Sequence, residues 1–307
     1  MHQIAEQALI LFSTPLYIVI IGAEILLSHF QHRKAYTLKD TLANIYLMLL
    51  NGGIDLAFRI IYMAVLVYFF NHKIYSISNA YIYWFTLVIV EDFLYYWLHR
   101  FDHEIRFFWA THITHHSSQK MNFTVGFRSS VFQPLYRFVY FIPLALLGFK
   151  VQDIALAYSA TQIWGILVHT ELIKKMGWLE YILVTPSHHR VHHGSNVKYL
   201  DKNMGMFLII WDKMFGTFQQ ELDAESYQPI KYGLTNNLEN TNLSNLIFYE
   251  WKSIFNDLKQ ELSFKQKLLY IFGKPGYSHN QSRKTSKQLQ EIETHTHNKL
   301  PKKSVTT

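Results

Sequence analysis

Long apolar runs, separated by short polar stretches, restrict most strongly how this chain can fold. Residues 8–27, 42–70 and 80–98 each approach or exceed the roughly 20 residues that a helix needs to cross the hydrocarbon core of a bilayer. Residues 131–149 and 154–168 are also apolar, and the turn between them predicts a helical hairpin. Because lipid leaves an irregular backbone without hydrogen-bond partners, these runs predict an all-α integral membrane protein with about four transmembrane helices.

Polar residues interrupt the first two runs. Pro15 and Glu24 lie in the first, which no basic segment precedes, so we expect a membrane helix there and not a secretory signal peptide. Residues 51–53, an Asn-Gly-Gly sequence, and Asp55 lie in the second. The second run is therefore either one crossing with a leading interfacial helix or a broken hairpin.

The charge balance predicts which side of the membrane each loop occupies. A formal charge of +7 would favour nucleic-acid binding in a soluble protein, but much of this excess flanks the apolar runs and indicates a membrane surface instead. The loop with Arg33, Lys34 and Lys39 is predicted to be cytoplasmic by the positive-inside rule. Counting the crossings then brings residues 99–116 and 188–193 to the cytoplasmic face. We expect no nucleic-acid partner.

Histidines form the second unusual pattern, because most of the 17 lie between His99 and His193. They comprise an i, i+4 pair, two i, i+3, i+4 triads and a single residue after the hairpin: His99 and His103; His112, His115 and His116; His189, His192 and His193; and His169. On a helix, such spacings bring side chains within about 6 Å of one another. Together they supply enough nitrogens for two metal ions, and imidazole suits iron, zinc, copper and nickel.

Several other chemistries lack their residues. The chain has no cysteine, which excludes disulfides, thiolate ligands and cysteine nucleophiles. His103 and Glu104 begin like a zinc-protease motif, but Phe107 occupies the position of the second histidine. A non-catalytic metal-binding membrane protein and a metal-dependent lipid hydrolase stay as alternatives. The first would need ligands along a crossing path, and the second normally has a carboxylate among its ligands.

At these histidines the chain resembles the fatty acid hydroxylase and sterol desaturase superfamily, whose members carry the same three histidine boxes. The resemblance spans about residues 80–218, and the segments around Trp109, Thr185, Asp201 and Trp211 are similar to the alkylglycerol monooxygenase branch. It implies membrane helices under a cytoplasmic helical cap, with a di-iron centre between them that could carry zinc as purified. It also implies a lipid substrate, O₂ and an external reductant, which is tetrahydrobiopterin or a cytochrome or ferredoxin chain.

The resemblance further implies roles for individual residues. Glu104 matches a glutamate of the alkylglycerol branch and is the candidate catalytic residue. Asp92, Asn203 and Asp212 are candidates for orienting imidazole N–H groups, and His188 is a weaker candidate beside the last box. The metal ligands implied are nine histidines: His99, His103, His112, His115, His116, His169, His189, His192 and His193.

Taken together, the sequence predicts a multi-pass membrane di-iron oxygenase that hydroxylates, oxidatively cleaves or desaturates a lipid. We expect membrane helices in residues 1–79, the catalytic domain in 80–222, an amphipathic helical region in 223–276 and a disordered basic tail in 277–307. The substrate, the reductant and the oligomeric state stay open at this point.

Overall fold

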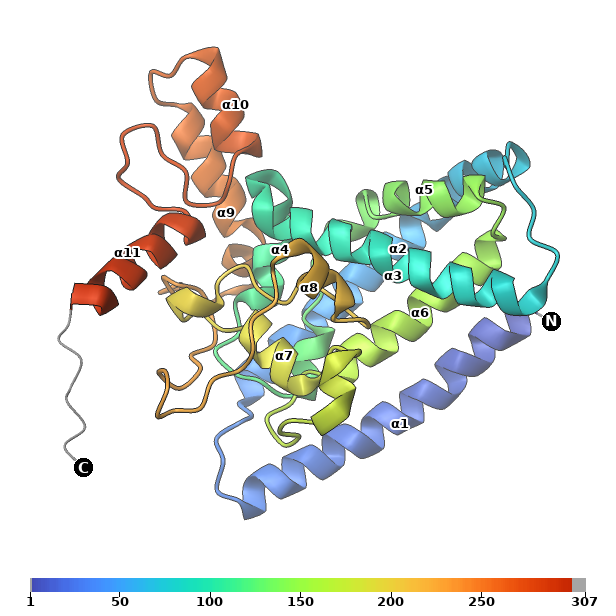
Figure 1. Ribbon diagram of the computed structural model, residues 1–307, viewed down its shortest axis with the longest axis horizontal. Coiled ribbons are helices and arrows are strands. Elements are labelled where there is room, and N and C mark those ends of the chain that lie inside the picture. Colours follow the sequence, from blue (N-terminus) through green and yellow to red (C-terminus); the bar gives the residue numbers. More distant parts are fainter. Residues whose placement is uncertain (1, 300–307) are drawn as a thin grey trace.

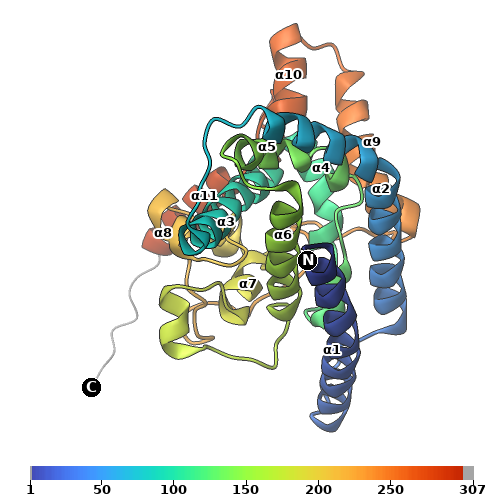
Figure 2. The ribbon, with the colours of Figure 1, turned by 90° about the vertical axis from the view of Figure 1, so that its right-hand side faces the viewer.

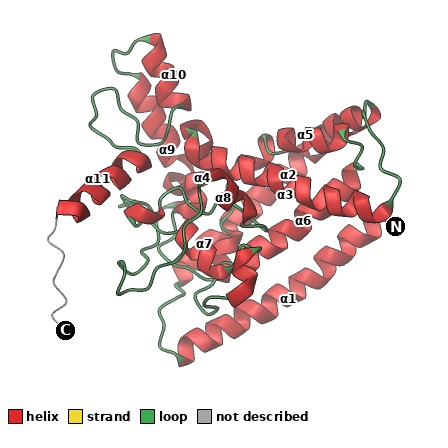
Figure 3. Cartoon of the chain, in the orientation of Figure 1, coloured by secondary structure: helices red, strands yellow, loops and turns green. Residues whose placement is uncertain are grey.

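The computed structural model describes residues 2–299, and the side chains of residues 15–296. In that range the chain is helical and forms no β-strand; its extended pairing is limited to two isolated bridges, Leu183 with Leu208 and Gly194 with Tyr232. The predicted all-α fold is therefore confirmed for the described residues (Figure 3).

Five helices run side by side as a bundle (Figures 1 and 2). They are α1 (His2–Phe30), α2 (Leu38–Asn71), α3 (Ala80–Glu104), α5 (Phe138–Leu146) and α6 (Val151–Leu167). Among the described residues, only α2 is both long and apolar enough to cross a membrane, with a mean hydropathy of 1.8 in its most apolar window. Apolar side chains packed between α2, α3, α5 and α6 form the main core, with Leu87 and Leu144 completely buried.

Two details of the bundle go beyond the sequence predictions. Helix α2 continues without a break through Gly52 and Gly53, which excludes the broken hairpin in that run. Helix α5 has only nine residues, and a short 3₁₀ helix, Gln133–Leu135, precedes it. Pro134 lies in that 3₁₀ helix and Pro143 within α5, and because proline lacks an N–H, a single helix over 131–149 is disfavoured.

Large apolar side chains are exposed on the outside of this bundle. Val19 on α1 is 67% exposed, Ile60 on α2 is 83% exposed and Phe85 on α3 is 71% exposed. Large exposed apolar side chains on helices of this length indicate a lipid environment. The protein is thus a membrane protein.

The remaining elements gather at one end of the bundle and form the cap (Figure 1). This end holds the N-terminus of α2 and the C-termini of α3 and α6. The cap comprises α4 (Arg106–His116), η1 (Phe123–Phe127), η3 (Gly177–Tyr181), α7 (Pro186–His192), η4 (Val197–Tyr199), α8 (Ile210–Phe215), α9 (Leu243–Leu258), α10 (Phe264–Phe272) and α11 (Ser286–Lys299). Loops make up much of the cap (Figure 3), so its conformation depends largely on side-chain hydrogen bonds.

The C-terminal region differs from the predicted disordered tail. Residues Ser286–Lys299 form helix α11, whose Gln290 amide donates hydrogen bonds to the carbonyls of Val197 and Leu200. Tyr227 donates a hydrogen bond to Glu293. The polar composition that indicates disorder therefore also supplies hydrogen bonds to the cap. The predicted tail beyond Lys299 lies outside the described residues.

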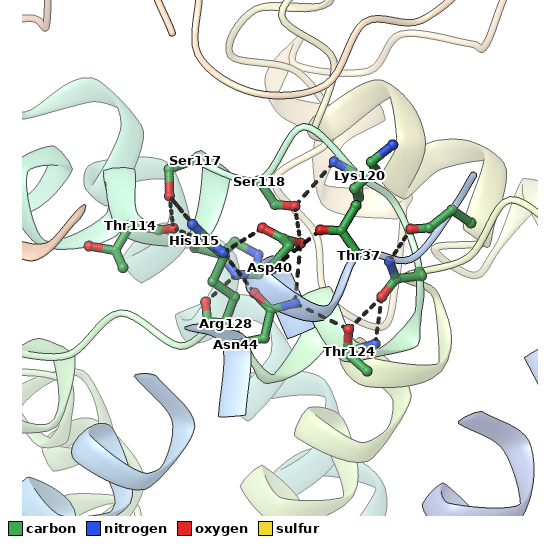
Figure 4. A network of polar contacts seen from close by, with 12 residues as sticks. Thr37, Asp40, Asn44, Thr114, His115, Ser117, Ser118, Lys120, Thr124 and Arg128 are labelled. Atoms are coloured by element: carbon green, nitrogen blue, oxygen red, sulfur yellow. Dashed lines mark hydrogen bonds and ion pairs between the residues drawn. The ribbon is translucent and has the colours of Figure 1, made fainter. Parts of the chain in front are cut away.

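A buried arginine joins the start of α2 to the end of α4 (Figure 4). The side chain of Arg128 is 2% exposed, and its guanidinium donates to Asp40 at 3.0 Å and to Asn44 at 2.7 Å, both on α2. The same guanidinium donates to the Thr114 carbonyl at 2.9 Å. A buried charge needs such a complete set of partners, so Arg128 fixes the cap against the bundle.

We predict that Arg128→Met destabilises the protein by about 3 kcal/mol or more, because Asp40 and Asn44 lose their common donor. Thermal unfolding in detergent, followed by intrinsic fluorescence, measures the change. Lys120→Met is the matched control: Lys120 donates to the Lys34 carbonyl at an exposed position, and we expect a change within about 0.5 kcal/mol. Equal unfolding temperatures for the two variants would contradict this assignment.

Candidate metal centre

The structure brings nine histidines together where the cap meets the bundle. They form two groups: His99, His103, His112, His116 and His192 in the first, and His115, His169, His189 and His193 in the second. Within each group, one nitrogen from each ring lies within 4.8 Å of those from all the others. All nine imidazoles predicted as ligands are therefore in these two groups.

Each triad is divided between the two groups. Of the histidines on α4, His112 and His116 belong to the first group and His115 to the second. In the last box, His192 belongs to the first group, whereas His189 and His193 belong to the second. The groups adjoin, because the rings of His116 and His193 stack with centroids 4.4 Å apart.

Backbone carbonyls orient four of the rings. The Nδ1 atoms of His99, His115, His169 and His192 lie 2.6–3.0 Å from the carbonyl oxygens of Met204, Arg128, Gly165 and Lys202, respectively. A carbonyl can only accept, so each Nδ1 carries the proton and each Nε2 presents its lone pair. That tautomer is the one a metal-binding imidazole needs, and the bond fixes the plane of the ring.

Burial favours the neutral form of imidazoles in both groups. It lowers the pKa of His112, His116 and His192 well below the ordinary value, and neighbouring imidazoles lower it further. Burial also lowers the pKa of His115 to about 4. Neutral imidazole is the form that binds a metal ion.

The nitrogens are arranged as a set of converging acceptors. His99 Nε2 lies 3.1 Å from His112 Nε2, and His189 Nε2 lies 2.8 Å from His169 Nε2. The Nε2 atoms of His103 and His192 are buried and have no hydrogen-bond partner within the described chain. Leaving such groups without a partner costs free energy, whereas a cation in each group would satisfy several lone pairs together. The donor set therefore fits transition-metal ions.

The structure places His188, a weaker candidate, and Glu104, the catalytic candidate, outside both groups. The His188 ring accepts a hydrogen bond from the Thr185 N–H in the capping box of α7 and packs against Phe218. Glu104 accepts a hydrogen bond from Arg100 at 2.9 Å, and its side chain is 28% exposed. A role for Glu104 in catalysis stays a prediction.

The three residues predicted to orient imidazole N–H groups bind mainly backbone groups, and Asp92 and Asp212 also accept from the side chains of Trp211 and Thr217. Asp92 accepts from the N–H groups of Phe207 and Leu208. Asp212 accepts from the N–H of Met204, whose carbonyl in turn faces the His99 Nδ1. Asn203 donates to the carbonyls of His188 and Gln219. They shape the loop over residues 203–212, and none of their hydrogen bonds in the described part of the chain reaches a histidine ring of either group.

Other residues approach the rings that the sequence analysis did not single out. His112 Nδ1 lies 2.9 Å from the Ser130 hydroxyl and 3.7 Å from a carboxylate oxygen of Asp102. His103 Nδ1 lies 3.5 Å from a carboxylate oxygen of Asp201. Asp102 precedes His103 in the sequence, and this adjacency could have indicated that Asp102 lies near the ligands. The approach of Ser130 depends on a contact distant in sequence.

The fold and this site define a helical membrane protein with a buried polyhistidine centre. Residues 84–217 match the fatty acid hydroxylase family model, and this region holds all nine histidines of the two groups. Over these residues the chain is similar to the fatty acid hydroxylase family.

Comparison with characterised proteins agrees with this family. The chain is 35% identical to human alkylglycerol monooxygenase over 270 residues, which cover 86% of this chain and 59% of that protein. It is 31% identical to the ornithine lipid hydroxylase of Rhizobium tropici, over 43% of this chain and 40% of that protein. It is 26% identical to human lathosterol oxidase, over 48% of each chain. All three names are those of oxidoreductases.

The chain spans about half the length of the alkylglycerol monooxygenases that it matches: 59% of the human protein, 49% of that of Xenopus tropicalis and 42% of that of Danio rerio. No solved structure shows significant similarity to it.

We predict about two transition-metal ions per chain, because each group offers at least the four ligands of a common site. His192→Ala and His189→Ala should each reduce the metal content, and the double variant should reduce it further, since the two residues belong to different groups. Elemental analysis of protein purified under reducing, iron-replete conditions measures this. His188→Ala is the control and should keep the full content. Less than one ion in the unsubstituted protein would contradict the prediction.

Proposed function

We propose that this protein is a membrane-bound di-iron oxygenase that hydroxylates, oxidatively cleaves or desaturates a lipid. The observation that carries the proposal is the pair of adjoining, buried, all-histidine groups. Iron held by these residues would supply the oxidising chemistry that an unactivated C–H bond requires, with O₂ and electrons from an external donor. Zinc in a preparation would not argue against this, since zinc competes well for imidazole ligands.

The ligand set favours this reaction over the two alternatives. A hydrolytic zinc site usually combines three protein ligands with one open position, and often includes a carboxylate. Here each group offers four or five imidazoles and neither contains a carboxylate. A metal carrier needs ligands along a path across the membrane, whereas these histidines gather at one end of the bundle.

The protein's own residues orient the imidazoles and exclude bulk water from the centre. Backbone carbonyls hold four imidazoles in one tautomer, and Arg128, whose carbonyl faces the His115 Nδ1, is itself fixed by Asp40 and Asn44. The rings of the first group are 5% exposed or less, so bulk water is excluded from that group. A preorganised, water-poor site protects an oxidising centre from side reactions.

The names of the relatives support a lipid as the substrate class. Alkylglycerol monooxygenase and ornithine lipid hydroxylase are named for lipids, and lathosterol oxidase for a sterol. We infer that electrons come from outside the chain, from tetrahydrobiopterin or from a cytochrome or ferredoxin chain.

We further propose that α1, α2, α3 and the α5–α6 hairpin anchor the protein in the bilayer, with the cap in the cytoplasm. This arrangement gives residues 1–79 an anchoring role and residues 80–222 the catalytic role. Helix α5, with nine residues, would enter the bilayer as part of a hairpin with α6.

We predict O₂-dependent loss of a membrane lipid when the protein is expressed in cells that otherwise lack this protein. Lipid profiling with and without O₂ measures this. His115→Ala and His192→Ala should abolish the loss, because each removes one imidazole from a different group. His188→Ala should keep most of it. A folded His192→Ala variant with unchanged O₂-dependent turnover would contradict the di-iron proposal.

Glu104→Gln in the same assay tests the catalytic assignment. Full metal content with lost turnover would show that the carboxylate takes part in the reaction. Unchanged turnover would show that Glu104 serves mainly as the partner of Arg100.

Cysteine labelling tests the sidedness, because the chain has no cysteine of its own. Lys150 lies at the start of α6, and Lys198 is exposed in the cap at the opposite end. An impermeant thiol reagent added to intact cells should label Lys150→Cys and spare Lys198→Cys. The reverse pattern would mean that the cap faces outward.

A further inference from the structure

A cavity of about 160 Å³ lies between α2, α5 and α6, apart from the two histidine groups. Charged and phenolic side chains line one part of it, including Asp55, Arg59 and Arg137. Apolar side chains line the rest, including Leu66 and Phe141. A cavity with one charged part and one apolar part matches a lipid, which has a polar head group and an apolar chain.

The charged residues form one connected cluster. Arg137 on the cap side of α5 pairs with Asp55, and Arg59 donates to the same carboxylate at 2.8 Å. Tyr62 also donates to it, at 3.3 Å. Two guanidinium groups thus share one carboxylate, and the charged residues lining the cavity carry a net charge of about +1. The side chain of Arg59 is 51% exposed, so this arginine is free to bind a further anion.

The position of the cluster along α2 matches the edge of a bilayer. The first turns of α2 pack against the cap, where Asp40 and Asn44 bind Arg128 and the Asn51 amide binds the Ser130 carbonyl. The rest of the helix, residues 52–71, has about the length that crosses a hydrocarbon core. Asp55 and Arg59 therefore lie in the first two turns of that segment, at the depth of lipid head groups on the cap side.

Aromatic rings connect the cluster to the metal centre. The Arg137 guanidinium lies 4.8 Å from the centroid of the Tyr158 ring. Tyr158 in turn contacts Tyr95, with centroids 6.2 Å apart, and Tyr95 contacts His99, with centroids 6.0 Å apart. A head group on Arg137 would thus lie two rings away from a histidine of the first group.

We propose that this cavity binds a lipid with an anionic head group, which Arg59 and Arg137 hold while the chain lies along Leu66 and Phe141. The charge excess is the argument for an anion, because an unbalanced arginine beside hydrocarbon is costly and a carboxylate or phosphate balances it. The proposal rests on the membrane arrangement proposed above. It does not require turnover, so binding and activity can fail independently.

Equilibrium binding to the purified protein in detergent, with O₂ excluded to prevent turnover, tests the proposal. Radiolabelled oleate should bind and be displaced by unlabelled oleate and by oleoyl-lysophosphatidate, and the stronger competitor identifies the preferred head group. Monooleoylglycerol, which has the same chain but no charge, should compete at least about fivefold more weakly, the size of one partly exposed charge contact. Inorganic phosphate should not compete, because it lacks the chain. Equal competition by monooleoylglycerol, or competition by phosphate, would overturn the proposal.

Two substitutions that change the charge of the cluster in opposite directions make the test more specific. Arg59→Gln should weaken oleate binding about fivefold, and Asp55→Asn should strengthen it, because the two arginines lose a competing anion. Lys73→Gln is the matched control, since Lys73 lies beyond the far end of α2, over Phe70, and should bind oleate like the unsubstituted protein. Unchanged binding by Arg59→Gln, or weaker binding by folded Asp55→Asn, would overturn the proposal. If Asp55→Asn does not fold, Arg59→Gln decides.

Discussion

The hydrogen bond from a buried imidazole Nδ1–H to a backbone carbonyl is the interaction on which this structure depends. It recurs at His99, His115, His169 and His192, with carbonyls from three segments: the loop at residues 202–204, Arg128 and the end of α6. Each bond selects one tautomer and directs the other nitrogen into the cluster. Because the acceptors are main-chain atoms, the backbone of the cap and the end of α6 must be correctly placed before any nitrogen can converge.

That placement depends on buried charged side chains. Arg128 holds the start of α2 to the end of α4, and Arg106 at the start of α4 binds Glu250 and Asp257 of α9, each at 2.6 Å. Carboxylates of α9 thus fix one end of the helix that carries His112, His115 and His116, and the Arg128 guanidinium fixes the other. Burying such charges costs free energy that their partners offset, and what the protein gains is one defined geometry at the centre.

Much of the fold could be predicted from the sequence because its main signal is local. The apolar runs at 8–27, 42–70 and 80–98 each lie within one helix, and the turn before Val151 separates α5 from α6 as expected. The sequence left details open, or did not predict them, where several local preferences compete. Glycines at 52 and 53 are tolerated inside α2, while the run at 131–149 became a 3₁₀ helix and a nine-residue helix around its two prolines. The polar C-terminal region forms α11 through contacts with the cap that are distant in sequence.

The sequence by itself determined which imidazoles could converge, because i, i+3, i+4 spacing puts three side chains on one face of a helix. Only the tertiary structure decided how they are shared. Within a triad, the rings at i, i+3 and i+4 point in directions that differ enough for a second helix to divide them, so His115 joins His189 and His193 while His116 joins His192. The oxygen atoms that orient the rings were likewise decided by tertiary contacts, since a backbone carbonyl has no signature in the sequence. Local spacing determines which histidines can be ligands, and packing between distant segments determines how they divide into two groups.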